Sequence, residues 1–266
     1  NSLQHNHSVS MSGGTDKGTY YASLSAMFDP GWTEQSSVNR YTVNLNSSYN
    51  LSRTLKLNLI GNASYRKQRA PGTLSSNVDA VTGEVTRDFD INPYSYALNT
   101  SRVLDPNEFY TRNYAPFNIQ HELQNNYLNL NVTDFRVQAE MKYNPFKGME
   151  LSAIGAVKYT ATSQEHFILD ESNQAQAYRA MGTSTIMSVN PFLYTDPDNP
   201  YALPISVLPE GGIYNRGDNS MLGSALRATA NYPPEIAGTH ILTLSGGTEP
   251  NNIDRPSPPV RGRRQP

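Results

Sequence analysis

The stretch that decides the fold is residues 38–51, which read Val-Asn-Arg-Tyr-Thr-Val-Asn-Leu-Asn-Ser-Ser-Tyr-Asn-Leu. From Tyr41 to Leu51, every second residue is apolar or aromatic except Ser47, and the residues between them are Thr, Asn and Ser. Side chains two residues apart on a β-strand lie on the same face. The alternation therefore predicts a strand with one apolar and one polar face.

The same two-residue period recurs along the chain, whereas a helical period is nearly absent. Clear alternation is found in three more segments, 55–66, 133–143 and 149–159. Weaker alternation is found at 5–12, 20–28, 222–232 and 239–247. The sequence thus predicts an all-β chain with about eight strands.

Two kinds of connection alternate between these predicted strands. Short connections rich in turn residues lie at 13–18, 52–54, 144–148 and 233–238. The others, at 29–37, 67–132 and 160–221, are longer, and the last two far exceed an ordinary hairpin loop. Short turns at one end of a sheet and long loops at the other are typical of an outer-membrane β-barrel. We expect an antiparallel transmembrane β-barrel, present in part, with long external loops at 67–132 and 160–221.

Aromatic residues on the apolar face favour the same architecture. Three strands each carry two aromatics eight residues apart: Tyr20 and Phe28, Tyr41 and Tyr49, and Phe135 and Tyr143. Eight residues span about 26 Å of strand, or about 20 Å of height at a tilt of about 40°. That height is close to the apolar band that aromatic girdles bound in membrane barrels.

Composition narrows the class of protein further. Of the 266 residues, 37% are hydrophobic and 17% are charged, the mean hydropathy is −0.58, and no run of 18 apolar residues predicts a transmembrane helix. A net charge of −2 argues against a nucleic acid as partner. The absence of Cys excludes disulfides, thiol catalysis and Cys-ligated metals.

The two ends of the sequence indicate a piece of a longer protein. Alternation is already under way at His5, without the pattern of a signal peptide before it. Residues 250–266 turn abruptly rich in Pro and Arg, and we expect this tail to be disordered or an artefact of truncation. The predicted barrel portion is therefore 1–249.

Several separated motifs resemble the SusC/RagA family of TonB-linked outer-membrane transporters. They include His5–Thr15, Thr19–Leu24, Arg40-Tyr41, Tyr110–Asn118, Ser172–Ala175, Asn190–Asp196 and Gly211–Arg216, in the family's order. The resemblance covers residues 1–249. Two departures stand out: the TonB box, plug domain and most barrel strands of the family have no counterpart here, and Pro250 begins a tail where the family continues a strand.

The resemblance implies a role in nutrient import. Family members take up glycan or peptide fragments across the outer membrane of Bacteroidetes-type bacteria, with a SusD-like surface lipoprotein as lid and energy from TonB. We therefore expect an outer-membrane location and four partners: the lipoprotein, the TonB complex, membrane lipid and an oligosaccharide or peptide substrate.

No residue pattern predicts catalysis, a cofactor or a metal site. Nucleophile, zinc-protease, P-loop and dinucleotide fingerprints are absent from the sequence. His5 and His7 could chelate a metal from one strand face, but an outward row near the membrane interface is the favoured interpretation. Residues 196–200 lack the ligand spacing of a dedicated calcium-binding loop and are predicted to form a turn flanked by prolines. We expect no enzymatic activity.

Candidate ligand-binding residues are the aromatics of the two long loops, because Tyr offers a flat apolar face with a polar handle to sugars and peptides. They are Tyr94, Tyr96, Tyr110, Tyr114, Tyr178, Tyr194, Tyr201 and Tyr214. The favoured alternative is that these side chains pack the loops together or contact the lipoprotein. Polar residues of the opposite strand face, such as Asn44, Asn62 and Arg136, would line a wet lumen or meet the plug.

Two rivals to the importer remain open. One is a self-contained eight-strand membrane barrel with a structural or adhesive role, since eight strands suffice for closure. The other is a soluble β-rich enzyme or carbohydrate-binding module, for which the aromatic spacing would be a coincidence.

Overall fold

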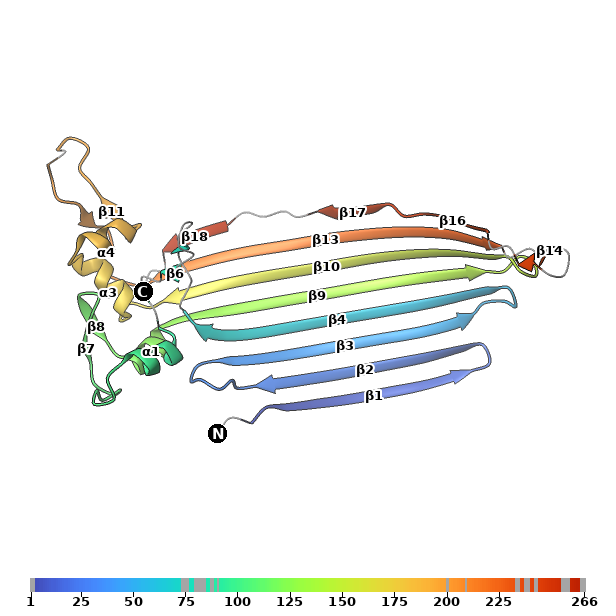
Figure 1. Ribbon diagram of the computed structural model, residues 1–266, viewed down its shortest axis with the longest axis horizontal. Helices are drawn as coiled ribbons and strands as arrows, with labels where there is room; N and C mark the ends of the chain where they lie inside the picture. Colours follow the sequence, from blue (N-terminus) through green and yellow to red (C-terminus); the bar gives the residue numbers. More distant parts are fainter. Residues whose placement is uncertain are drawn as a thin grey trace.

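The computed structural model describes residues 3–72, 77–78, 85–86, 89, 91–199, 201–208, 210–232, 235–236, 240–241, 244–254 and 259–263. Its main element is one long antiparallel sheet whose strands follow one another in chain order (Figure 1). The strands are β1 (His5–Thr15), β2 (Gly18–Asp29), β3 (Ser37–Asn50), β4 (Leu55–Pro71), β9 (Asn126–Tyr143), β10 (Glu150–Ile168), β13 (Ile213–Tyr232) and β16 (Leu244–Thr248). Seven of the eight predicted strands correspond to strands of this sheet. Of the eighth, 239–247, residues 244–247 belong to β16, whereas 239, 242 and 243 lie outside the described residues. The all-β prediction is confirmed. The described strands do not close into a barrel.

The long strands extend farther toward the loop end than the alternation predicted. β9 begins at Asn126 and β10 runs to Ile168, so the two long loops are 72–125 and 169–212 rather than 67–132 and 160–221. The reason is an inversion of polarity along β9. Leu128 and Leu130 lie on the face that is polar lower down, whereas Asn129 and Asn131 lie on the face that is apolar lower down. A strand predicted from the requirement that the same face stay apolar throughout therefore ends before the real strand does.

The Pro- and Arg-rich tail contains strands in its described part. β17 (Asn251–Asp254) and β18 (Pro259–Arg263) pair with β13 in the register that β16 begins. Together the three form one interrupted edge strand along β13, so the sheet does not end at residue 249. Proline is tolerated there because an edge strand needs only half of its ladder bonds. The apolar alternation is nevertheless lost, since Asp254 lies beside Leu222 on the apolar face.

Over most of its length the sheet buries neither face. Large apolar side chains of the apolar face are open to the surroundings, with exposed fractions of 73% for Val9, 60% for Leu24 and 56% for Leu226. The other face carries polar groups that bond across strands: the Asn62 amide donates to Asn44, and the Asn44 amide donates to Ser23. A contiguous apolar surface of this extent on a protein marks a region that something else covers.

The aromatics of the apolar face run diagonally across the strands. The cross-strand row of Tyr20 continues through Ser47, Leu59, Ala139 and Gly155 to Leu226. The last aromatic of β13 is Tyr232, six residues beyond Leu226, and Tyr49 and Tyr143 lie at intermediate heights. Six residues span about 20 Å, and the five strand-to-strand steps from β2 to β13 span about 24 Å. The line of aromatics therefore departs by about 40° from the perpendicular to the strands.

A second diagonal of aromatics lies nearer the loop end. Its members are Phe28, Tyr41, Tyr65, Phe135 and Tyr159, and the line descends in the same direction as the first. We call the first line the turn-end girdle and the second the loop-end girdle. Because the two slope alike, the apolar band between them has nearly constant height when the strands are tilted.

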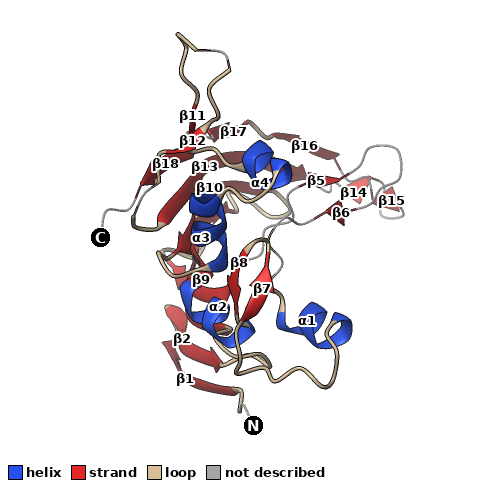
Figure 2. Cartoon of the chain, turned by 90° about the vertical axis from the view of Figure 1, so that its left-hand side faces the viewer, coloured by secondary structure: helices blue, strands red, loops and turns tan. Residues whose placement is uncertain are grey.

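The loop end carries a small subdomain, seen end-on in Figure 2, that we call the loop cap: the described residues of 89–125 and 169–212. It contains α1 (Pro93–Asn99), α2 (Ile119–Asn125), α3 (Asn173–Ala180) and α4 (Ser184–Val189), with short strands β7 (Tyr110–Arg112), β8 (Ala115–Phe117), β11 (Leu193–Tyr194) and β12 (Ile205–Ser206). Other short strands are β5 (Asn77–Val78), β6 (Val85–Thr86), β14 (Glu235–Ile236) and β15 (His240–Ile241). Within the described residues, no helix has the length and apolar character needed to cross a membrane.

The apolar core of the described chain lies in the loop cap and where it meets the sheet. One cluster joins Ala175, Tyr178 and Ile186 of the cap to Ile168 of β10 and Ile213 of β13. These two strand residues pair with each other and lie on the polar face of the sheet. The described part of the loop cap thus packs against the polar face at the loop end and does not cover the apolar face.

Candidate functional site in the loop cap

The short helices of the loop cap begin at side chains that satisfy their free backbone N–H groups. Asn118 accepts from the N–H groups of Gln120 and His121 at the start of α2. Ser172 accepts from Ala175 at the start of α3, and Thr183 accepts from Ile186 at the start of α4. Such caps matter here because helices of six to eight residues are unstable alone.

Asn173 joins three parts of the loop cap. Its side-chain amide donates to the backbone carbonyls of Arg112, Ala115 and Pro116, at 2.8, 3.1 and 3.1 Å. Its backbone N–H donates to Glu122 Oε1 at 2.7 Å. One buried side chain thereby holds the β7–β8 hairpin against α3, and α3 against α2. The segments 110–118 and 172–175, quoted above for their resemblance to a transporter family, meet at this residue.

Glu122 is a buried carboxyl group of which only one oxygen accepts a hydrogen bond from the described residues. Its exposed fraction is 1%, and Oε2 has no hydrogen-bond partner among the described residues. Burial raises the pKa of Glu122 to about 7, against the lowering effects of the Asn173 hydrogen bond and of nearby Arg112. Near neutral pH, the group therefore exists in both protonation states.

A second buried polar group lies where the cap meets the sheet. His166 Nε2 is 2.6 Å from Asn126 Oδ1, and the Asn126 amide donates to Gln174 of α3 at 3.2 Å. Gly72, at the end of β4, donates its N–H to the carbonyl of Asn126. A Cβ at Gly72 would collide with the Asn126 side chain, so only glycine fits at this position.

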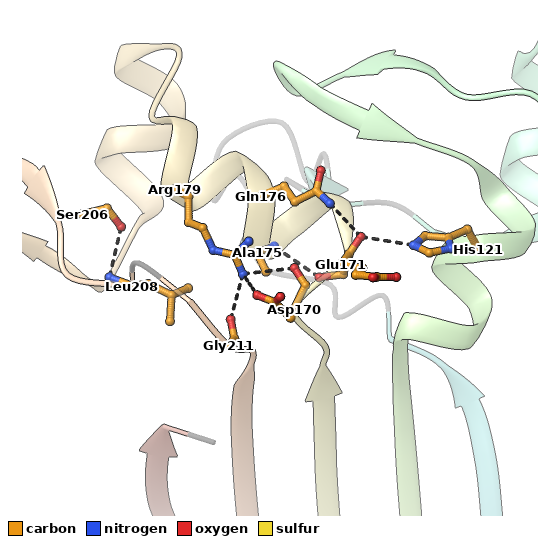
Figure 3. Close-up of polar contacts among 10 residues, drawn as sticks. His121, Asp170, Glu171, Ala175, Gln176, Arg179, Ser206, Leu208 and Gly211 are labelled. Carbon is orange, nitrogen blue, oxygen red and sulfur yellow. Dashed lines mark hydrogen bonds and ion pairs between the residues drawn. The ribbon is translucent and has the colours of Figure 1, made fainter. Parts of the chain in front are cut away.

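Arg179 ties α3 to two strand ends (Figure 3). It forms an ion pair with Asp170 and donates to the carbonyl of Gly211 at 2.9 Å. Nearby, Gln176 donates to the carbonyl of Glu171, which also lies 3.2 Å from His121 Nε2. These contacts position the cap over the ends of β10 and β13.

Three of the eight predicted tyrosines pack inside the loop cap. Tyr178 is buried, with an exposed fraction of 6%, and meets Phe89 edge to face at 5.5 Å. Tyr96 and Tyr110 pack against the buried Phe117 at centroid distances of 6.4 and 5.4 Å. Burial raises the pKa of Tyr110 above its usual range. These three side chains contribute to the packing of the cap, and a binding role for them stays a prediction.

Four other predicted tyrosines are exposed but come from different parts of the cap. The exposed fractions are 55% for Tyr94, 61% for Tyr114, 49% for Tyr194 and 95% for Tyr201. Tyr94 meets Trp32 edge to face at 6.1 Å, whereas Tyr114 lies beside Gly182. The described structure brings no two of these four into ring contact. They are open to a ligand or a partner, and their binding role stays a prediction.

Tyr214 differs from the rest because it lies on the sheet, on the face that is apolar lower down. Its hydroxyl donates to Glu165 at 2.5 Å, and its ring lies 5.0 Å from Phe167. Phe167 stacks on Tyr127 at 5.1 Å. Tyr214, Phe167 and Tyr127 thus form a row of aromatic rings on the face of the sheet that points away from the cap.

The polar groups of the described chain suggest no metal site. No three His, Cys, Asp or Glu side chains in the described ranges gather to hold an ion. His5 Nδ1 and His7 Nε2 lie 3.1 Å apart on an exposed edge strand, next to the ring of Phe28. At 196–200, the Asp196 carboxylate accepts from the N–H of Asp198, as in the predicted turn.

The sequence pattern missed Asn173, Glu122, Asn126 and His166, the buried polar residues of the cap and of its junction with the sheet. They carry no periodic signal, because their partners lie 40 to 61 residues away in the chain. One signal in the sequence could have pointed to this contact. Asn173 lies in the motif Ser172–Ala175 and its carbonyl partners lie in the motif Tyr110–Asn118, two segments that resemble the same family.

Comparison with known proteins gives the fold only. No protein-family model and no curated protein matches the sequence. Among solved structures, the chain resembles one described as the RagAB peptide transporter, with a TM-score of 0.61 and 17% identity over 96% of this chain. It also resembles the RagAB peptide importer in its closed-closed state, with a TM-score of 0.59 and 16% identity. The chain spans about a quarter of those chains, covering 25% and 26% of their length. Its fold resembles that of part of a chain in the RagAB peptide transporter.

Proposed function

We propose that this chain is part of the wall and external loops of an outer-membrane β-barrel in a TonB-dependent nutrient importer of the SusC/RagA type. The observation that carries the proposal is the pair of parallel aromatic diagonals on the exposed apolar face. Their slopes, about 40° for the turn-end girdle and about 35° for the loop-end girdle, lie within the 35–45° tilt of strands in membrane barrels. Tilting the strands by an angle in that range brings both girdles level with a membrane plane.

Three further features support the membrane assignment. The apolar face is exposed between the girdles and has no cover in the described chain. Above the loop-end girdle this face turns polar, as a surface leaving the membrane would. The loop cap packs on the opposite face, so in a closed barrel it would lie over the lumen, where imported molecules enter.

For the substrate, we propose peptides or oligosaccharides captured near the loop cap. The solved proteins with this fold are described as peptide transporters, which favours peptides. Tyr94, Tyr114, Tyr194 and Tyr201 would contact the substrate or a SusD-like lipoprotein lid. TonB would supply the energy, and the chain itself would have no enzymatic activity.

Membrane insertion is tested by tryptophan quenching with brominated lipid. In a Trp32→Phe background, Val43→Trp places a single indole on the apolar face between the girdles, and Asn44→Trp places it on the polar face of the same strand. We expect strong quenching for Val43→Trp and weak quenching for Asn44→Trp. Equal quenching of the two, or recovery of the protein from the soluble fraction, would refute the membrane assignment and favour the soluble module.

Transport is tested separately, by uptake of labelled peptides and oligosaccharides into cells that carry the intact importer, with and without TonB. TonB-dependent uptake that falls when the exposed cap tyrosines become Ala would support the proposed importer. A membrane-inserted protein without any uptake would favour the structural or adhesive barrel.

A further inference from the structure

The outer face of β4 carries two cations just above the loop-end girdle. Lys67 and Arg69 follow Tyr65 at two-residue spacing, so all three lie on one face of the strand. With strands tilted by about 40°, Lys67 lies about 5 Å and Arg69 about 10 Å above the girdle. In the proposed membrane orientation, that is the height of the lipid headgroups.

Neither cation forms an ion pair with a carboxylate of the described residues. Lys67 is exposed and makes no ion pair or hydrogen bond with any residue that the structure describes. Arg69 lies with its guanidinium 3.9 Å from the centroid of the Tyr127 ring, and its Nε has no partner in the described ranges. The Tyr127 ring orients the guanidinium but does not satisfy its donors.

The groups beside the two cations are neutral hydrogen-bonding side chains. In register, Lys67 lies between Asn39 and Asn131, and Arg69 lies between Ser37 and Asn129.

The two acidic groups nearest in register on the same face lie farther off, and both are engaged. Glu165 is two strands from Arg69, about 10 Å, and accepts from Tyr214. Asp218 is three strands from Lys67 and pairs with Arg216 at 2.7 Å. Within the described residues, the positive charge of β4 is therefore left for an anion from outside the chain.

We propose that Lys67 and Arg69, which we call the β4 collar, bind the phosphate group of an anionic lipid headgroup in the outer leaflet. This inference rests on the membrane orientation of the proposed function. A flexible ammonium and a planar guanidinium about 7 Å apart along the strand would clamp the phosphate oxygens. The amides of Asn131 and Asn129 would donate to the remaining oxygens or to headgroup sugars.

The test uses the protein extracted from membranes in mild detergent and titrated with lipid A, a phosphorylated glycolipid, while bound lipid is counted by native mass spectrometry. Wild type is compared with K67A, R69A, the double variant and K67R. The matched control is Arg66→Ala, which removes a cation from the same strand on the opposite face. Phosphatidylcholine and inorganic phosphate are the neutral-lipid and free-anion probes.

We expect each single Ala variant to weaken lipid A binding about fivefold, and the double variant about thirtyfold. K67R and R66A should bind like wild type, and phosphatidylcholine should bind equally to all variants.

Unchanged binding in the double variant, or an equal loss in R66A, would overturn the collar. Displacement of lipid A by micromolar inorganic phosphate would identify an anion site that is not specific for lipid. A wild-type protein that enters membranes but shows none of these effects overturns only the collar, whereas a soluble protein overturns the proposed function as well.

Discussion

The tilted sheet and the loop cap are stabilised in opposite ways. Between the girdles the sheet has no buried side chain in its described part, and its strands are joined by backbone ladders while one face is left apolar and exposed. The loop cap buries its apolar residues and also several polar ones, among them Glu122 and Asn173, which bond to segments far away in the chain. The sheet therefore depends on its surroundings for stability, whereas the cap carries its own core. We therefore expect a substitution in one region to change the stability of that region and not of the other.

The largest effect is expected for a charge on the exposed apolar face. Leu45→Arg, midway between the girdle residues Tyr41 and Tyr49, should destabilise the membrane-embedded protein by about 2–4 kcal/mol, because an arginine near the midplane of the bilayer loses its hydration. The matched substitution Asn44→Arg, on the polar face of the same strand, should cost less than about 1 kcal/mol. Urea titration in lipid vesicles measures both. Equal costs would mean that the two faces have similar surroundings.

Next comes the buried side chain that organises the loop cap. Asn173→Ala removes three hydrogen bonds to backbone carbonyls and leaves buried acceptors unsatisfied, at an expected cost of about 2–3 kcal/mol. Hydrogen exchange should rise in 110–118 and 172–180 and stay unchanged in β2 and β3. Gln176→Ala, one turn farther along α3, is the control: its half-buried side chain makes a single hydrogen bond to the Glu171 carbonyl, so the substitution should cost less than Asn173→Ala. Faster exchange throughout the sheet would contradict the independence of the two regions.

A pH dependence is expected from Glu122. Its pKa is raised in the fold, so the folded cap binds a proton more tightly than the unfolded chain does. Cap stability should therefore be highest below about pH 4.5 and fall as the pH rises through about 7, by up to about 3 kcal/mol. Proteolytic susceptibility of the cap, followed from pH 5 to 8, measures this trend.

Glu122→Gln supplies the control for that pH dependence. The amide keeps an oxygen that can accept from the N–H of Asn173, but it cannot ionise. We expect the variant to lose the pH dependence and to resist proteolysis at pH 8 better than wild type. A variant with the wild-type slope would assign the titration to another group.

The smallest effect on stability is expected at the exposed tip of the cap. Tyr201 has an exposed fraction of 95%, so Tyr201→Ala should shift the unfolding free energy by less than about 0.5 kcal/mol. Tyr178→Ala, within the core of the same subdomain, should cost about 3–4 kcal/mol. Thermal unfolding of the cap compares the pair. A loss of uptake in Tyr201→Ala without a loss of stability would assign that side chain to binding.

The sequence located the sheet well and the candidate site poorly. Strand positions followed from alternation. When the two faces of a strand have different surroundings, each pair of successive residues contains one apolar and one polar side chain, as in Tyr41-Thr42 and Val43-Asn44. The strand ends beyond Tyr65 and Phe135 did not follow, because the polarity of the two faces inverts there. Among the tyrosines, residue type could not separate the buried Tyr178 from the exposed Tyr201.

By itself, the sequence determined an antiparallel all-β sheet with short turns at one end, long loops at the other and aromatics at fixed heights. Those properties are local, since each depends on the period of a few neighbouring residues. Only the tertiary structure decided the register and the face that the cap covers. Register aligns the aromatics of separate strands into two sloping lines, and it places neutral side chains of the neighbouring strands beside Lys67 and Arg69. The junction at Asn173 joins segments 51 to 61 residues apart, a separation at which sequence spacing carries no information about contact.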